Sequence, residues 1–91
     1  MALTREKIRD GVINALIRIQ KDNDADIPEI TDDTCPMDDL PGFDSTLIFE
    51  IIFHLEDEFG FELSDKIFQR KEDKELSVSK MVDAVCREKR L

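Results

Sequence analysis

The chain contains no tryptophan and no tyrosine, one histidine, two cysteines, and only three residues each of glycine and proline. Without Trp or Tyr, its interior has to be built from aliphatic side chains and from six phenylalanines. Cys35 and Cys86 form no CxxC pair and have no metal-ligand spacing with His54, so we expect no metal site. Cys86 lies on an apolar helical stripe, which favours a small core residue.

Basic residues are scarce in the middle of the chain. Residues 21–63 contain fourteen acidic residues and one lysine, residues 64–91 contain eight Lys or Arg against six acids, and the net charge is −9. Nucleic acids and anionic membranes repel such a chain, so we expect neither as a partner. The loop acids are typical of a solubilising surface, whereas those beside Ser45 favour docking to basic partner proteins.

Long apolar runs are also missing. No segment approaches the length of a transmembrane helix, and no signal-peptide pattern precedes Thr4. We therefore expect a cytoplasmic protein with reduced thiols and no membrane insertion. A length of 91 residues allows a single domain, residues 1–91, with one modest core. We expect this domain to be a monomer.

Apolar residues at helical spacing predict three long helices, over about residues 5–20, 45–59 and from 78 onward. Thr4 is expected to cap the first of them and Ser77 the last. Gly11 is a mild flaw in the first helix, because glycine lowers helix stability. No segment alternates with period two, so we expect no sheet.

A shorter helix is predicted to begin at Ser64, to bury Ile67 and Phe68, and to end at about Gln69, followed by an exposed connection over residues 70–75. The predicted fold class is therefore all-α. It is a four-helix bundle with three long helices, a short third helix and a long loop between the first two.

Residues 21–43 form that loop, which is rich in Asp and carries all three prolines. A loop of this length in a small domain indicates either function or disorder. Four apolar residues are expected to pin it onto the bundle: Ile27, Ile30, Leu40 and Phe43.

The helix over residues 45–59, with Asp44 or Ser45 as its cap and Gly60 after its end, has two apolar faces when its residues are placed about 100° apart. The core-facing arc contains Leu47, Ile48, Ile51, Ile52, Leu55 and Phe59. Phe49 and Phe53 lie on the opposite side with Thr46, with Glu50 and Asp57 on one flank and Glu56 on the other. Either the first helix or the loop covers the two rings, or they form a docking surface, which we favour.

The run Gly42-x-Asp44-Ser45, followed by Glu50 and by Leu55-Glu56-x-Glu58-Phe59, resembles the acyl carrier protein family. Leu63-Ser64-Asp65, and Ser77-Val78 with Asp83, resemble the starts of that family's third and fourth helices. The resemblance covers nearly the whole chain, from Thr4 to about Arg87, and the family also has a long, pinned first loop.

The resemblance implies that Ser45 carries 4′-phosphopantetheine, transferred from coenzyme A by a separate Mg²⁺-dependent phosphopantetheinyl transferase. The arm would hold acyl groups as thioesters for enzymes of fatty-acid, lipid or polyketide-type biosynthesis, and the carrier itself would have no catalytic residue. The dipole and the unpaired amides at the helix start favour the phosphodiester. Ile48, Ile51 and Leu55, with residues of the first, third and fourth helices, are candidates to line a cavity for the acyl chain.

The same resemblance implies a recognition surface for basic patches on the transferase and on acyl-loading and acyl-processing enzymes. Its expected residues are Asp44, Thr46, Phe49, Glu50, Phe53, Glu56 and Asp57. The chain departs from the family pattern at Thr46, where Leu or Met is usual, and at Ile48, where an acid is common. Leu47, just before Ile48, is also apolar. Phe49 and Phe53 are also bulkier than usual, which indicates a specialised carrier.

Other functions fit less well. Asp22, Asp24 and Asp26 have the one-three-five spacing of an EF-hand loop, but Ile27 stands where that loop needs glycine. A serine hydrolase is disfavoured because His54 lies on a different face of the helix from Ser45, so we assign it no catalytic role. Two alternatives stay open: a peptidyl or aminoacyl carrier, and a carrier-like adaptor that is never modified.

Overall fold

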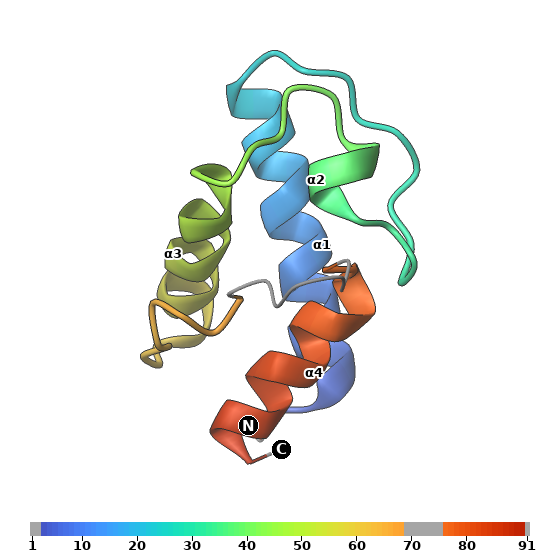
Figure 1. Ribbon diagram of the computed structural model, residues 1–91. Helices are drawn as coiled ribbons and strands as arrows, with labels where there is room; N and C mark the ends of the chain where they lie inside the picture. Colours follow the sequence, from blue (N-terminus) through green and yellow to red (C-terminus); the bar gives the residue numbers. More distant parts are fainter. Residues whose placement is uncertain (1–2, 69–75, 91) are drawn as a thin grey trace.

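The computed structural model describes residues 3–68 and 76–90. Over these ranges the chain forms four α-helices and no strand: α1 (Arg5–Asp22), α2 (Pro36–Asp39), α3 (Leu47–Phe59) and α4 (Val78–Lys89). α1 is the central element, because both α3 and α4 pack against it (Figure 1). The prediction of an all-α fold is confirmed at this level.

The core lies where the apolar stripes of the three long helices meet. Its side chains with no exposed surface are Ile8, Val12, Leu16, Ile19, Ile51, Leu55, Val78, Met81 and Val85. These positions belong to the stripes that the sequence predicts, and Cys86 is buried beside them as expected. Burial of aliphatic side chains therefore aligns α3 and α4 on α1.

The helix ends show the expected capping chemistry. Thr4 Oγ1 accepts a hydrogen bond from the Lys7 amide at 3.3 Å, and Ser77 Oγ accepts one from the Lys80 amide at 3.2 Å. α1 extends two residues beyond the predicted end at Gln20. Its last carbonyls are satisfied by the residues that follow: the backbone and side-chain N–H groups of Asn23 donate to Ile19 O, the Asp24 amide to Lys21 O and the Ala25 amide to Gln20 O.

The prediction of a helix beginning at Ser64 is wrong for residues 64–68. Here Ser64 Oγ accepts from the Lys66 amide and Ser64 O accepts from the Ile67 amide, which closes a turn instead of a helix. Phe68 is buried and Ile67 half-buried, as expected. The predicted end at Gln69 and the predicted connection over residues 70–75 lie outside the described residues.

The short helix lies instead within the long loop, as α2. Pro36 occupies its first turn, where a missing N–H costs nothing, and the Cys35 amide donates to Asp39 Oδ2 at 2.8 Å. Residues 21–43 were predicted to lack secondary structure, and a four-residue helix is too short to produce a periodic pattern.

The loop is fastened to the bundle partly as predicted. Leu40 and Phe43 are buried and Ile30 is half-buried, but Ile27 is 40% exposed, so the expectation that it pins the loop is wrong. A polar side chain holds that part of the loop: Gln20 is buried, and its Nε2 donates to Asp26 O at 2.9 Å and to Pro41 O at 3.0 Å.

The loop is also fastened to the start of α4. The Val78 amide donates to Thr34 O and the Ser79 amide to Asp32 O, both at 2.9 Å. These amides belong to the first turn of α4 and have no partner within that helix. The loop therefore fixes the position at which α4 begins, next to the site described below.

Gly11 has a packing role that the sequence did not indicate. A Cβ placed on it would lie 2.7 Å from Phe59 Cε2 and 2.7 Å from Glu58 Oε2. Glycine at this point of α1 therefore allows the end of α3 to approach closely, which outweighs its low helix propensity.

Candidate functional site

Asp44 organises the turn that leads into α3. Its Oδ1 accepts hydrogen bonds from the Thr46 amide at 2.9 Å and from the Thr46 hydroxyl, and its carbonyl accepts from the Leu47 amide at 3.1 Å. The hydroxyl and amide of Thr46 lower the pKa of Asp44 below its ordinary value. The prediction that Asp44 or Ser45 caps this helix is wrong: α3 begins at Leu47, two residues later than expected, so Thr46 is the N-cap, and the Asp44 side chain holds the turn before it.

Ser45 lies between Asp44 and Thr46 in this turn and is exposed. Gly42, three residues earlier, has a φ of +73°, a conformation that glycine adopts without strain and that brings the chain into the turn. The position of Ser45 is thus set by a hydrogen-bonded turn on one side and by the rigid helix α3 on the other. Its hydroxyl is accessible to another protein.

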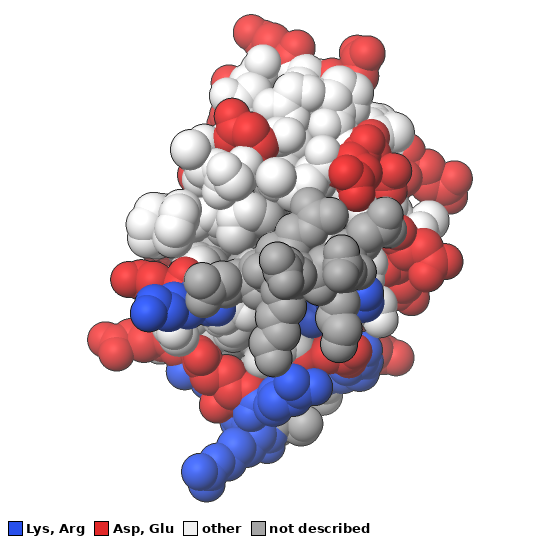
Figure 2. Space-filling view, viewed as in Figure 1, with Lys and Arg blue, Asp and Glu red and all other residues white. Residues whose placement is uncertain are grey.

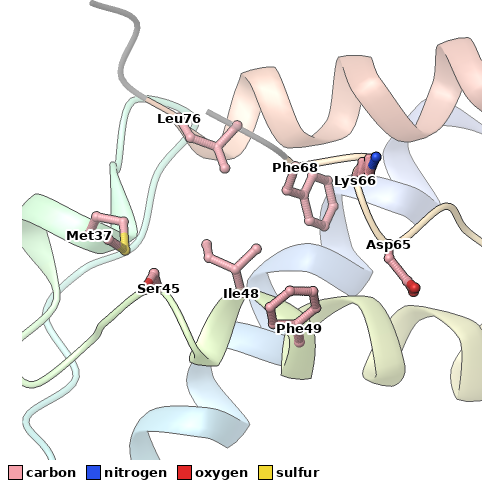
Figure 3. Close-up of a pocket in the computed structure, with 8 residues that line it drawn as sticks. All are labelled: Met37, Ser45, Ile48, Phe49, Asp65, Lys66, Phe68 and Leu76. Atoms are coloured by element: carbon pink, nitrogen blue, oxygen red, sulfur yellow. The ribbon is translucent and has the colours of Figure 1, made fainter. Parts of the chain in front are cut away.

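Ser45 stands on the rim of an apolar cavity of about 320 Å³. The cavity is lined by Met37, Ser45, Ile48, Phe49, Asp65, Lys66, Phe68 and Leu76. Figure 3 shows Met37 and Ser45 at one end, with Ile48 in the middle and Phe49, Phe68, Asp65 and Lys66 toward the other. Four separate segments of the chain therefore combine to form it.

The lining residues only partly match the sequence expectation. Ile48 contributes to the wall as expected, but Ile51 and Leu55 are completely buried in the core and do not line the cavity. Met37 and Leu76 were not anticipated, because they come from the loop and from the residues before α4. Only tertiary packing brings them beside α3.

The first amides of α3 are less available to an anion than the sequence suggested. The Thr46 amide is taken by Asp44 Oδ1, the Leu47 amide by Asp44 O, and the Ile48 amide by Ser45 O at 3.3 Å. The expectation that these amides are unpaired is therefore wrong. Any gain for a phosphate group at Ser45 has to come from the helix dipole.

The outer face of α3 carries two exposed phenylalanines. Phe49 is 48% exposed and Phe53 is 60% exposed, so neither α1 nor the loop covers them, and Glu50 beside them is exposed as well. Glu56 differs from the other predicted recognition residues. It is half-buried, and its Oε2 accepts a hydrogen bond from the Leu63 amide at 2.9 Å, so it holds the segment after Gly60.

His54 and Asp57 face a second, polar hollow between α1 and α3, of about 300 Å³. It is lined by Gly11, Asn14, Ala15, Arg18, His54, Asp57 and Glu58. Ser45 belongs to the first cavity and not to this one, so the structure does not bring the serine and the histidine together.

The charge is unevenly distributed over the surface. Figure 2 shows acidic side chains around an uncharged area in the upper part of the molecule, and Lys and Arg gathered at the lower end. Within residues 3–68 and 76–90, no group of three His, Cys, Asp or Glu side chains is placed to hold a metal ion. No helix in this part of the chain has the length and apolar character needed to cross a membrane.

No protein-family model matches the chain, and no curated sequence is significantly similar to it. The site itself combines an exposed serine, the cavity beside it and the acidic face of α3.

Proposed function

We propose that this chain is an acyl carrier protein, in which Ser45 is esterified by 4′-phosphopantetheine and acyl chains are presented to partner enzymes. The observation that carries the proposal is the exposed Ser45 at the start of α3, on the rim of an apolar cavity. When attached, the arm supplies a thiol that holds the acyl group as a thioester. The carrier has no catalytic role of its own.

The residues around Ser45 fit such a group. An esterified serine must be reached by a separate transferase, and Ser45 is exposed in a turn that Asp44 and Thr46 hold rigid. An aliphatic chain attached nearby needs apolar surface to leave water, and the cavity wall is made mainly of Met37, Ile48, Phe49, Phe68 and Leu76. The helical arrangement, with a long fastened loop before the serine-bearing turn, also supports an acyl-carrier-like bundle.

The outer face of α3 supports docking to basic partners, namely the phosphopantetheinyl transferase and acyl-loading and acyl-processing enzymes. Complete burial of a Phe side chain contributes about 1.5–3 kcal/mol, and Phe49 and Phe53 both keep about half of their surface exposed. A partner that covers them would gain contact energy, while Glu50 and Asp57 would orient its basic groups. Asp44 and Thr46 would extend this recognition surface toward Ser45.

Two alternatives share the same fold. A peptidyl or aminoacyl carrier would use Ser45 in the same way but would hold a polar cargo, which the apolar wall of the cavity does not favour. A carrier-like adaptor would use only the outer face of α3 and would leave Ser45 unmodified. A pathway in fatty-acid, lipid or polyketide-type synthesis, a cytoplasmic location and a monomeric state remain part of the proposal.

The proposal is tested by intact mass after incubation with coenzyme A, Mg²⁺ and a broad-specificity phosphopantetheinyl transferase. The native chain is expected to gain one phosphopantetheinyl group, and Ser45→Ala none. Ser64→Ala is the matched control, because Ser64 is also an exposed serine in a turn beside an aspartate. No gain in the native chain, under conditions that modify a control carrier, would favour the adaptor.

A further inference from the structure

The two exposed phenylalanines of α3 are not equivalent. They lie one helical turn apart on the same face, and both are about half exposed. Phe49 lines the apolar cavity beside Ser45, whereas Phe53 does not. Figure 3 shows the ring of Phe49 below the space that Ile48 and Phe68 border.

We propose that Phe49 is the residue that determines the length of the acyl chain this carrier shelters, while Phe53 serves only the outer surface. This inference rests on the proposed function. It assigns a cargo class, an unbranched aliphatic chain of about ten carbons or fewer, and it names the side chain that sets the limit.

The size of the cavity limits the length of the chain that it can hold. An apolar cavity of about 150 Å³ accepts one benzene molecule. The cavity here is about 320 Å³, so it has room for roughly twice that content, on the order of ten carbon atoms. A longer chain has to leave part of its length in water.

Phe49 lies where the cavity meets water. Of the residues that line the cavity, Phe68 is buried within the core cluster and Ile48 is half-buried. Phe49 is the large aromatic residue that has one side toward the cavity and the other toward water. Asp65 and Lys66, which are exposed and charged, line the same end of the cavity as Phe49 (Figure 3). An apolar chain that extends past Phe49 therefore reaches charged groups, whose desolvation is unfavourable.

The test uses the full chain loaded on Ser45 from acyl-coenzyme A donors with saturated chains of increasing length. The measured quantity is the difference in melting temperature between each acylated form and the unacylated holo form of the same variant. In the native chain this difference is expected to rise with chain length and to level off at about ten carbons. Phe49→Ala enlarges the cavity and is expected to move the plateau to longer chains, whereas Phe53→Ala is expected to keep the native profile.

Two further variants separate an effect on acyl-chain length from an effect on the general stability of the fold. Each variant is compared with its own holo form, so a loss of basal stability cancels, and Phe49→Leu provides a milder truncation. Phe49→Trp fills part of the cavity and should move the plateau to shorter chains, which a merely structural role would not do.

The outcomes are distinct. Failure of Ser45 to load in the mass measurement would overturn the proposed function, and this inference with it. Loading that proceeds normally, with the same length profile in Phe49→Ala as in the native chain, would overturn the inference alone. An equal shift of the plateau in Phe53→Ala and Phe49→Ala would do so too, because it would show that the cavity does not distinguish the two rings.

Discussion

Asp44 is the residue at the site whose ionisation is tied most directly to structure. Its pKa is lowered first by the Thr46 hydroxyl and then by the Thr46 amide. A carboxyl group with a lower pKa in the folded chain stabilises the fold above its unfolded pKa, about 3.9. This contribution is lost as the pH falls through the lower, folded pKa. We therefore expect the native chain to be more stable than Asp44→Asn at neutral pH, with the gap closing in acid.

Thermal unfolding of both proteins from neutral pH down to about pH 2 measures this gap. Thr46→Val is the informative companion, because it removes the hydroxyl that contributes most to the pKa shift. In that background the gap should begin to close at a higher pH. A gap that is independent of pH would mean that the ionised carboxylate contributes nothing to the turn.

At the residue scale, local periodicity predicted which side chains of a single helix are exposed. The exposure of Phe49 and Phe53 follows from their angle on α3, and the sequence predicted it. Gln20 was missed because its partners, Asp26 O and Pro41 O, are backbone groups of the loop that no pattern reveals. Its Oε1 has no hydrogen-bond partner among the described residues, so this buried amide is only partly satisfied.

Gly11 affects how closely two helices pack, because it lies on α1 against the end of α3. Alanine usually stabilises a helix by about 1 kcal/mol relative to glycine. At Gly11 the added methyl group would meet the ring of Phe59 and the Glu58 carboxylate. Overpacking typically costs about 1–3 kcal/mol, so Gly11→Ala is expected to lower the free energy of unfolding by about 1 kcal/mol.

Chemical denaturation of a double-mutant cycle with Phe59→Leu provides the control, because leucine lacks the ring atoms that the new methyl group would meet. In that background Gly11→Ala should be neutral or stabilising. The packing argument would be refuted by an equal stabilisation in both backgrounds.

Long amphipathic helices and their caps could be predicted because each is encoded within a few consecutive turns. Thr4, Ser77 and Gly60 act at the ends where the sequence placed them. The turn over residues 64–68 and the helix α2 could not be predicted in the same way. Both are too short to produce a periodic pattern, and the turn is also held by a distant segment: the Ser64 amide donates to Glu88 Oε2 at 3.0 Å.

The same distinction holds for the candidate site. Ser45 and the aromatic face of α3 lie in one continuous segment, so a sequence pattern was enough to select them. The cavity needed the structure, because Met37 and Leu76 come from segments that are far apart in the sequence and are joined only in the fold. The loop hydrogen bonds to Val78 and Ser79 are what hold the start of α4 in place there.

At the scale of the whole molecule, the acidic residues together produce a negative electrostatic field that is larger than any single contact would give. Fourteen acids lie within residues 21–63, and the net charge is −9. Such a field raises the rate at which basic partners associate, and the effect falls as salt increases. If only the overall field matters, removing any two acids lowers the rate of association with a basic partner equally. If partners dock on α3, removing the acids beside Phe49 and Phe53 lowers that rate more.

Two matched pairs of substitutions distinguish these cases. Glu50→Gln with Asp57→Asn neutralises the face of α3, and Asp24→Asn with Glu29→Gln removes the same charge from the exposed loop. Asn is well suited to position 24, where φ is +54°.

With the phosphopantetheinyl transferase as the partner, kcat/KM for modification of Ser45 is the quantity to measure at low and high salt. The α3 pair is expected to lower it by about tenfold at low salt, and the loop pair by less than about twofold. At physiological ionic strength, where the Debye length is about 8 Å, the difference should shrink. Equal losses in both pairs would assign the effect to net charge, and α3 would then lose its place as the docking face.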